Sequence, residues 1–393
     1  MRGGGQLHFA IAGAGVGGLA SAILLARQGH RVNLFDQLDA PRPTGSGLML
    51  QPTGLAVLDA MGLGNEARSR GARITRLHGK AGKRTVLDVQ YERMTKGADA
   101  VGIHRSALFD LLWTAAQAEA IDFAFPRRVI GASQRHVEFA HGEKDGPFDL
   151  VIDASGARSA IAQHDDTPLP YGAYWATVDW HEAMPSRTSL SQRYRQARQM
   201  AGLLPVGRVP GEEGEKVAFF WSVRGDQAAS LRDAGVAALL DQWAGLWPET
   251  ADIAAQVGSF DRLTLARYAH HTMASPIGDG VVHLGDSWHS TSPQLGQGAN
   301  MALLDAFALA KTIETHRDLA DALSAFVFMR QDHVRLYQLL SHLLTPVYQS
   351  DGWFVPTLRD WLVGPVSRVG LVQKIQARLV SGLVGRPLSQ LGL

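Results

Sequence analysis

The first forty residues alternate between short apolar runs and polar turns in an order that predicts a βαβ unit. Residues 7–12 form an apolar run of strand length, the segment GAGVGG follows at 13–18, and residues 19–28 have the composition of a helix. A second strand-like run, RVNLFD, occupies residues 31–36. Strand, glycine turn, helix and strand within about thirty residues predict a parallel pair with a crossover helix. This interpretation also accounts for the uncharged stretch 9–26, which length alone would assign to a membrane span.

A central block and the C-terminal part of the chain follow different patterns. Residues 167–265 are rich in aromatic side chains and contain several strand-like runs, with a helix predicted at 228–247. Residues 73–91 alternate in polarity as hairpin strands do, and we assign the segment 73–97 to the same domain as the central block. Strand, loop and helix return from residue 281. The tail, 321–393, has helical composition, with breaks expected at Pro346, Pro356 and Pro365.

Composition narrows the class of protein. Hydrophobic residues make up 46% of the 393 residues and charged residues 19%, which is typical of a soluble protein with a large core. The 38 basic and 37 acidic residues nearly balance, so no nucleic-acid partner is expected. The absence of cysteine excludes disulfides, thiolate metal sites and iron–sulfur clusters, and it fits a cytoplasmic protein. The histidines have no acidic partner at ligand spacing, so no metal site is predicted.

The turn after the first strand has the spacing of a dinucleotide-binding turn. Gly13, Gly15 and Gly18 match G-x-G-x-x-G between a predicted strand and a predicted helix. Gly13 would permit the tight turn, Gly15 the approach of a pyrophosphate, and Gly18 the packing of helix on strand. Asp36 ends the second strand, where its carboxylate could accept hydrogen bonds from the adenosine ribose. The turn alone does not distinguish NAD from FAD.

A second glycine-containing loop, GDSWHSTSPQLGQGAN at 285–300, lies far downstream between an apolar strand and an apolar helix. A simple NAD dehydrogenase has no need of such a loop, whereas the ribityl chain and isoalloxazine ring of FAD extend beyond the first turn. Gly285 would allow close approach of the backbone, and Asp286 would accept from ribityl hydroxyls. The segment 293–298 would run beside the flavin ring. The helix beginning near Gly298 would direct its positive end at the pyrimidine edge of that ring.

At these residues the sequence resembles the class A flavoprotein monooxygenases, the FAD-dependent aromatic hydroxylases similar to para-hydroxybenzoate hydroxylase. The family pattern, GD-x-x-H, then P-x-x-G-x-G-x-N and an aspartate in the next helix, is met by Gly285, Asp286, His289, Pro293, Gly296, Gly298, Asn300 and Asp305. In addition, Arg105 resembles the family's arginine beside FAD, and Arg42, Ser46 and Gly47 resemble its segment along the ribityl chain and ring. With Ala299, these positions form the cofactor-binding set that the resemblance implies.

The resemblance also implies a fold and an activity. The fold is α/β: an FAD-binding Rossmann-type domain like that of glutathione reductase, an inserted mixed β-sheet substrate domain and a helical C-terminal tail. The FAD-binding domain would comprise 6–72, 98–166 and 266–320, the substrate domain 73–97 and 167–265, and the tail 321–393. The implied activity is that of a monooxygenase. NAD(P)H reduces FAD, a flavin C4a-hydroperoxide forms with molecular oxygen, and one oxygen atom passes to a small aromatic or polycyclic metabolite.

Two positions depart from the family pattern. The family carries an aspartate in a turn such as G-A-D-G-x-x-S, where this chain has Ser155, and Asp153 lies two residues upstream. Because that motif takes part in handling NAD(P)H, the use of a nicotinamide is an open question. The pair Ser287-Trp288 replaces small residues and predicts a narrower space near the flavin. A flavin oxidase or reductase on the same fold, and a non-catalytic FAD-binding protein, therefore stay as alternatives.

The substrate side of the site is less well defined by the sequence. No general base is identified, and the candidates for the substrate pocket are Gln51, Tyr194, Trp221 and Pro293. The tail beyond residue 352 combines aromatic and aliphatic residues with an excess of basic over acidic ones. The favoured interpretation is a helical cover over the flavin domain, and the alternative is a segment lying on a membrane surface. The oligomeric state is not predicted.

Overall fold

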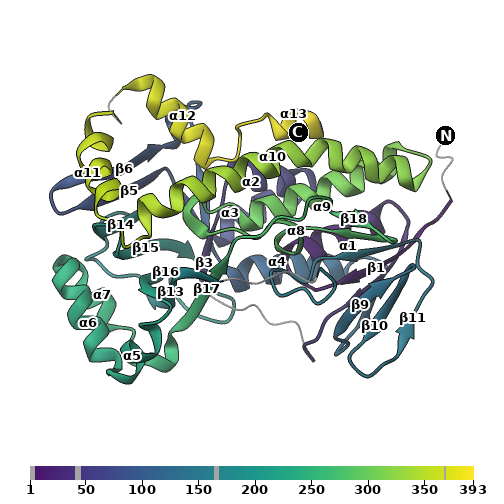
Figure 1. The fold of residues 1–393 in the computed structure, drawn as a ribbon, viewed down its shortest axis with the longest axis horizontal. Coiled ribbons are helices and arrows are strands. Elements are labelled where there is room, and N and C mark those ends of the chain that lie inside the picture. The colour runs from purple at the N-terminus through teal and green to yellow at the C-terminus, as the bar shows by residue number, and fades with distance from the viewer. Residues whose placement is uncertain (1–4, 40–45, 163–167, 367–368) are drawn as a thin grey trace.

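A computed structural model describes residues 5–39, 46–162, 168–366 and 369–393. Two parts, each built on its own large β-sheet, lie side by side, and the long C-terminal helices run across them (Figure 1). One sheet is mostly parallel and the other is mixed. This arrangement confirms the predicted α/β class with a Rossmann-type sheet, a second mixed sheet and a helical tail.

The first sheet has six strands in the order β18-β19-β12-β1-β2-β8. Strand β1 pairs in parallel with β2 and with β12, and β12 pairs in parallel with β19. Both faces of this sheet are covered, which is why β1 and β12 are almost entirely apolar. The strands are β1 (His8–Ala12), β2 (Arg31–Phe35), β8 (Ile121–Ala124), β12 (Leu150–Asp153), β18 (Ile277–Gly278) and β19 (Val281–His283).

Helices and two small sheets surround these strands. Helix α1 (Val16–Arg27) joins β1 to β2, as predicted, and Gly29 follows it with a φ of 86°, a backbone conformation that glycine adopts without strain. Helix α1 packs against α4 (Arg105–Gln117) and α9 (Gly298–Thr315). The remaining elements are α2 (Pro52–Ala60), α3 (Gly64–Arg70), the sheet of β3 (Gly47–Leu50), β7 (Ala100–His104) and β4 (Ala72–Ile74), and the sheet of β9 (Val129–Ser133), β10 (His136–Phe139) and β11 (Lys144–Asp145).

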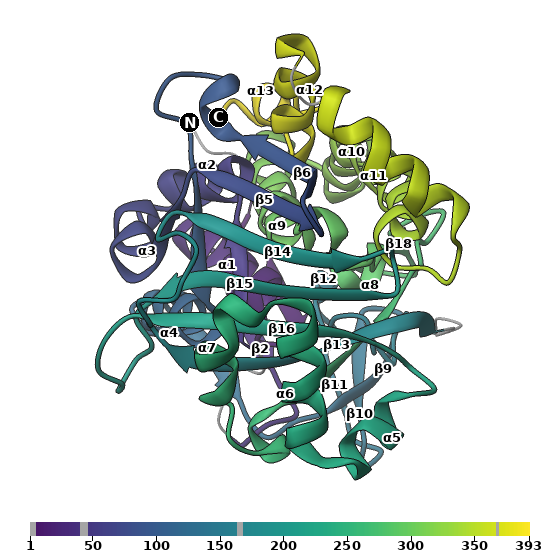
Figure 2. The ribbon, with the colours of Figure 1, turned by 90° about the vertical axis from the view of Figure 1, so that its left-hand side faces the viewer.

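The second sheet has seven strands in the order β17-β13-β16-β15-β14-β5-β6, and Figure 2 shows helices α6 and α7 in front of it. Tyr174, Ala176 and Val178 alternate along β13 and pack with these helices, whereas Trp175 belongs to the opposite face. The elements are β5 (Arg76–Ala81), β6 (Arg84–Gln90), β13 (Pro168–Asp179), β14 (Ser189–Arg195), β15 (Gln199–Gly207), β16 (Lys216–Arg224), β17 (Thr264–Ala269), α5 (Ala228–Asp233), α6 (Gly235–Leu246) and α7 (Ala251–Ala255).

Some predicted boundaries need correction. The single helix expected at 228–247 is two helices, because Gly235 has a φ of 85° and begins a new one. Pro346 lies inside the last turns of α10 (Leu319–Tyr348), so the helix does not break there. Pro356 and Pro365 both lie within α11 (Phe354–Val366), which is followed by α12 (Gly370–Val380) and α13 (Pro387–Leu391). The division into domains at the predicted residue numbers stays a prediction, and β17 extends past its boundary at residue 265.

Candidate functional site

The three glycines of the first turn have different surroundings. A Cβ atom added at Gly13, whose φ is 100°, would lie 2.6 Å from the carbonyl oxygen of Ala154. One added at Gly18 would lie 1.9 Å from the carbonyl oxygen of Gly13. One added at Gly15 would meet no atom within 4 Å. Gly13 and Gly18 are therefore required by the packing of the protein itself, whereas Gly15 borders open space where a ligand could approach the backbone.

Asp36 holds this turn in place. Its Oδ2 accepts a hydrogen bond of 2.8 Å from the backbone N–H of Ala14, and its Oδ1 accepts one of 3.0 Å from that of Leu38. Helix α1 begins directly after Gly15 and has no side-chain cap at its N-terminus. Free N–H groups at the start of a helix favour a bound anion such as a pyrophosphate. A carboxylate has further lone pairs, so Asp36 can brace the turn and still accept from a ribose hydroxyl.

The second loop meets the first turn at one residue of α9. A Cβ at Gly17, in the first turn of α1, would lie 3.4 Å from the Cβ of Ala302. A Cβ at Gly285 would lie 3.0 Å from the same atom. The two loops are separated by more than 260 residues in the sequence and yet lie beside the same side chain. The structure thus brings together the two turns that the sequence analysis singled out.

Asp286 begins the short helix α8 (Asp286–His289) beside the N-terminus of α9. A Cβ at Gly298 would lie 3.8 Å from its Oδ1. Among the described residues the carboxylate of Asp286 has no hydrogen bond, and it is accessible to solvent. Desolvation by the surrounding protein nevertheless raises its pKa, against the opposing charges of His289 and Arg105. A solvent-accessible carboxylate with no hydrogen-bond partner among the described residues is suited to accepting hydrogen bonds from a ligand hydroxyl.

A buried polar network fixes the position of this loop. Asp305 on α9 accepts hydrogen bonds from the backbone N–H of Gly285 (2.9 Å) and from Nε of Arg330 (2.7 Å), and its Oδ2 lies 2.7 Å from Nε2 of His289. Burial raises the pKa of Asp305, but the charges of His289 and Arg330 outweigh that effect and lower it. Arg330 in turn contacts His333, whose pKa burial lowers to about 3. Sequence reasoning found His289 and Asp305 but missed the two residues on α10.

The segment around Ser46 contacts the second sheet. The hydroxyl of Ser46 donates to the carbonyl oxygen of Ala176 at 2.8 Å, and a Cβ at Gly47 would lie 2.4 Å from Cγ1 of Val206. The side chain of Ser46 is thus engaged by the protein, and Gly47 is required by the close approach of β15. Arg42 lies outside the described residues.

Arg105 stands at the start of α4, with a solvent-accessible guanidinium group. No hydrogen bond or ion pair joins that group to another described residue. Its charge acts on Asp286 and on Tyr268, and burial raises the pKa of Tyr268 to about 12. The hydroxyl of Tyr268 accepts a hydrogen bond of 3.0 Å from Nε1 of Trp175. Arg105 is therefore placed near Asp286 and can meet a ligand bound there.

Asn300 and Gln51 join the loop to the end of β3. Oδ1 of Asn300 accepts from the backbone N–H of Gln51 at 2.8 Å, and its Nδ2 donates to the carbonyl oxygens of Met49 and Gly296. The side chain of Asn300 is fully used within the protein. Gln51 is 1% exposed and accepts a hydrogen bond from the Tyr91 hydroxyl, and its Nε2 has no partner among the described residues. A buried, unpaired amide beside Gly296 is suited to donating to a bound group.

The other substrate-pocket candidates lie in different places. Tyr194 is buried, donates to Oε1 of Gln192 at 3.0 Å and packs against Tyr348, with its ring centroid 5.7 Å away. Trp221 packs against Trp243 on the face covered by α6, so the structure does not bring it to the loop 285–300. Pro293 is exposed and begins the 3-10 turn Pro293–Leu295 in the second loop. The remaining position, Ala299, is in the first turn of α9.

Trp288 does not narrow the space near the loop, contrary to expectation. Its side chain is 2% exposed and belongs to the core of the first part, 5.8 Å from the ring of Phe326. Its Nε1 donates to the carbonyl oxygen of Met273 at 3.3 Å. The neighbouring Ser287 is fully buried and donates to the carbonyl oxygens of Asp153 and Leu284. Both side chains of this pair therefore fill the interior.

Asp153 places a carboxylate beside Ser155. The hydroxyl of Ser155 donates to Oδ1 of Asp153 at 2.5 Å, and that of Ser159 donates to Oδ2 at 2.6 Å. Nδ1 of His283 lies 2.8 Å from the same Oδ2. Burial raises the pKa of Asp153, but these hydrogen bonds outweigh burial and lower it. The departure at Ser155 therefore leaves a negative charge two residues away and hydrogen-bonded to the serine.

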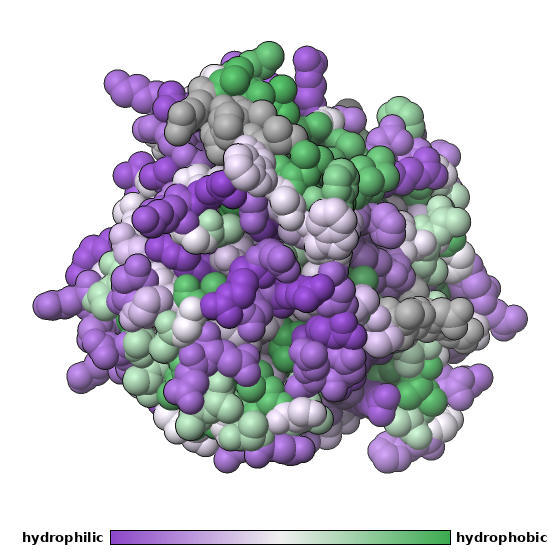
Figure 3. All heavy atoms as spheres, turned by 60° about the vertical axis from the view of Figure 1, so that its left-hand side comes forward, coloured by the Kyte–Doolittle hydropathy of each residue, from purple (hydrophilic) through white to green (hydrophobic). Residues whose placement is uncertain are grey.

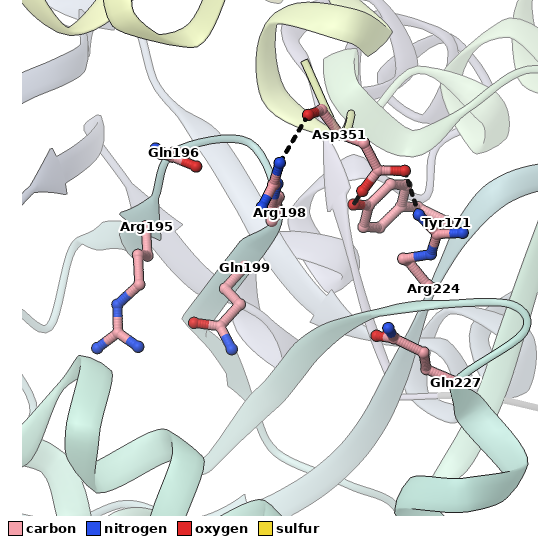
Figure 4. A pocket seen from close by; sticks show the side chains of 8 residues that line it. All are labelled: Tyr171, Arg195, Gln196, Arg198, Gln199, Arg224, Gln227 and Asp351. Carbon is pink, nitrogen blue, oxygen red and sulfur yellow. Dashed lines mark hydrogen bonds and ion pairs between the residues drawn. The ribbon is translucent and has the colours of Figure 1, made fainter. Parts of the chain in front are cut away.

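A separate open cavity of about 630 Å³ lies at the far end of the second sheet (Figure 4). Its polar lining includes Asp351, which accepts hydrogen bonds from the hydroxyl of Tyr171 and from Arg224. Arg198 donates to the backbone carbonyl oxygen of Asp351 at 3.1 Å. None of the predicted cofactor residues that the structure describes lines this cavity. Its contacts tie the segment after α10 to the second sheet.

The parallel sheet carries a glycine turn, and this turn and the second glycine loop both lie beside α9. Together they define a dinucleotide-binding α/β protein with a mixed-sheet second part. More particularly, residues 6–320 match the family described as "FAD binding domain" (FAD_binding_3), and the chain belongs to this family of FAD-dependent monooxygenases. Its members act on aromatic and heterocyclic substrates.

Individual relatives are similar over most of their length. The chain is 27% identical to a 3-hydroxybenzoate 6-hydroxylase of Klebsiella oxytoca over 334 residues, covering 81% of this chain and 83% of the relative. It is 25% identical to an aurachin C monooxygenase/isomerase of Stigmatella aurantiaca, covering 96% and 98%. The crystal structure of PqsL from P. aeruginosa in complex with 2-aminobenzoylacetate has the same fold, with a TM-score of 0.78 and 23% identity over 88% of this chain and 97% of PqsL.

Proposed function

We propose that the protein hydroxylates a small aromatic or heterocyclic substrate, using FAD bound across the two glycine turns and NAD(P)H as the electron donor. Reduced FAD supplies the activation of molecular oxygen and its transfer to an aromatic ring. The observation that supports this proposal most directly is the meeting of both turns at Ala302, with open space at Gly15. That space is where a pyrophosphate would reach the start of α1.

Residues of the two turns would bind different parts of the cofactor. The N-terminus of α1 would bind the pyrophosphate, and Asp36 would accept from the adenosine ribose. Asp286 would accept from a ribityl hydroxyl, while Arg105 supplies a positive charge nearby. The N-terminus of α9, with Gly298 and Ala299, would stabilise negative charge on the reduced ring. Asn300, Ser46 and Gly47 would act indirectly, because their contacts are with protein.

The substrate would lie between the loop 291–296 and the face of the second sheet that carries Trp175 and Phe220. These two rings lie 4.7 Å apart and offer an apolar wall that excludes water. The amide Nε2 of Gln51, which is unpaired within the part of the chain that the structure describes, would donate to the substrate or to the edge of the cofactor ring. Tyr194 adjoins this wall through Phe220, whereas Trp221 is left out of the proposed pocket.

A flavin oxidase or reductase is the second candidate, and Ser155 was the reason to consider it. The buried carboxylate of Asp153 lies 2.5 Å from the Ser155 hydroxyl, and it would supply the negative charge that the family's aspartate carries. This contact favours ordinary use of a nicotinamide over the alternative.

The test is to mix the FAD-loaded enzyme with NADH or NADPH under oxygen and a panel of phenols, anthranilates and quinolones. We expect substrate-stimulated oxidation of the nicotinamide and a product heavier by one oxygen atom. Gln51→Leu should lower turnover at least about tenfold while FAD stays bound, the loss of roughly one hydrogen bond. Gln28→Leu is the matched control, because Gln28 also has an unpaired buried amide atom but lies at the end of α1. Reduction of the flavin by a substrate without nicotinamide would favour the oxidase, and absence of any turnover would favour a non-catalytic protein.

A further inference from the structure

The outer faces of α11 and α12 carry large apolar side chains that the protein does not cover. We call these side chains, together with Trp353 directly before α11, the apolar patch, and its members are 46% to 69% exposed: Trp353, Phe354, Leu358, Trp361, Leu371 and Ile375. Figure 3 shows hydrophobic atoms gathered at the top of one face of the molecule. Single exposed apolar residues are ordinary on a protein surface, whereas a contiguous group marks an interaction site.

The spacing of these residues shows that each helix has an apolar face turned outward. Phe354, Leu358 and Trp361 are separated by four and three positions, so they lie along one side of α11. Leu371 and Ile375 are four apart on α12. Helix α12 buries Ala377 and Val380 against the protein, and both helices pack on β6. The patch is therefore additional to the side chains that attach these helices to the rest of the molecule.

Basic side chains lie beside the patch on α12 and in the β5–β6 hairpin. Lys374 and Arg378 are exposed on α12, and Lys83 and Arg84 are exposed in the β5–β6 hairpin. The guanidinium carbon of Arg84 lies 3.8 Å from the ring centroid of Trp361, so the hairpin and the patch are in contact. The only acidic residue in the sequence from 353 to 393 is Asp360, and it pairs with Arg359 at 2.6 Å. This rim of positive charge complements an anionic surface.

We propose that the apolar patch seats the protein on the surface of a bilayer that contains anionic lipid. Exposed Trp and Phe at the level of lipid headgroups, with Lys and Arg at the rim, are the features of a segment that lies in a membrane interface. Among the described residues, no helix is long and apolar enough to cross a membrane. A second copy of this chain is a poorer occupant, because a two-fold interface would bring the two basic rims together.

The test is co-sedimentation of the FAD-loaded protein with vesicles of phosphatidylcholine alone or mixed with phosphatidylglycerol. We expect binding to the mixed vesicles that weakens as salt is added. The triple variant Phe354→Ser/Leu358→Ser/Trp361→Ser should bind at least about tenfold more weakly, because its apolar contact is lost. Lys374→Gln and Arg378→Gln should each lower binding to the mixed vesicles about fivefold. Unchanged FAD content and melting temperature would show that these variants are folded.

Phe328→Ser provides the matched control. Phe328 is 76% exposed on α10, outside the patch, so its replacement should leave vesicle binding unchanged. Equal binding by the triple variant and the native protein would overturn the proposal, as would failure of the native protein to bind either vesicle. A dimer in sedimentation equilibrium that the triple variant converts to a monomer would assign the patch to a second copy of the chain, and would also overturn it.

Discussion

At the scale of single residues, the glycines of the first turn show how a motif combines two physical requirements. Gly18 is needed because the helix lies against the strand, and Gly15 is needed only if something binds. The sequence predicted both roles from spacing alone.

The sequence could not predict that Ser46 and Asn300 use their side chains within the protein. Their partners, Ala176, Met49 and Gln51, are distant in the sequence. The same holds for Trp288, whose partner Phe326 lies on α10.

Substitution of Gly15 should therefore lower the affinity for FAD, whereas substitution of Gly18 should lower the stability of the fold. Gly15→Val should leave the melting temperature of the apoprotein unchanged, because the new side chain enters open space. It should weaken FAD at least about a hundredfold, which corresponds to about 3 kcal/mol. Gly18→Ala should destabilise the apoprotein by about 1–3 kcal/mol through overpacking. Thermal denaturation and FAD titration of both variants measure this difference, and a destabilised Gly15→Val apoprotein would contradict it.

Asp286 should make the stability of the apoprotein depend on pH. Its folded-state pKa is raised, so the folded state holds the proton more tightly than the unfolded state. Stability is therefore lost as the pH rises from the ordinary carboxyl pKa through the raised one. Asp286→Asn, which cannot ionise, should be more stable than the native apoprotein at neutral pH and equally stable at low pH. Thermal melts of both apoproteins across this range provide the measurement, and parallel pH profiles would speak against the assignment.

At the scale of elements, the buried network ties α8, α9 and α10 into one support for the second loop. Asp305 and His289 were recognised from the resemblance to a known family, whereas Arg330 carries no local signal because a single arginine in a long helix is usually on the surface. Proline positions were similarly misleading, since Pro346 and Pro365 are accommodated inside helices that pack on the protein. Local sequence therefore predicted the existence of these helices better than their ends.

Replacement of Arg330 should show how much the buried network contributes to the stability of the protein. Arg330→Met should destabilise the protein by about 3–5 kcal/mol, because it leaves the buried carboxylate of Asp305 short of a partner. It should also lower FAD retention, since Gly285 is held by the same carboxylate. The double variant Arg330→Met/Asp305→Asn should be less destabilised than the sum of the single changes. Chemical denaturation of the four proteins gives the coupling energy, and strict additivity would argue against a shared network.

At the scale of the whole molecule, two parts are joined by contacts that also shape the site. Strand β3 and the start of α4 reach the second sheet through Ser46 and His104, and α10 leads from the buried network to the segment at Asp351. The sequence predicted both parts and their order, because the two large sheets differ in composition. The sequence could not predict which face of the second sheet meets the first part. Trp175 and Trp221 are the same residue type, and only the strand register shows that they lie on opposite faces.

The central claim is that the turn 13–18 and the loop 285–300 bind opposite ends of one FAD molecule. Calorimetric titration of the apoprotein with FAD and with ADP tests it most directly, because ADP occupies only the first turn. Asp286→Ala should weaken FAD at least about tenfold, the loss of a charge-assisted hydrogen bond, and leave ADP binding unchanged. Gly15→Val should weaken the binding of both at least about a hundredfold. Native FAD affinity in Asp286→Ala, or an equal loss of ADP and FAD in that variant, would contradict the account.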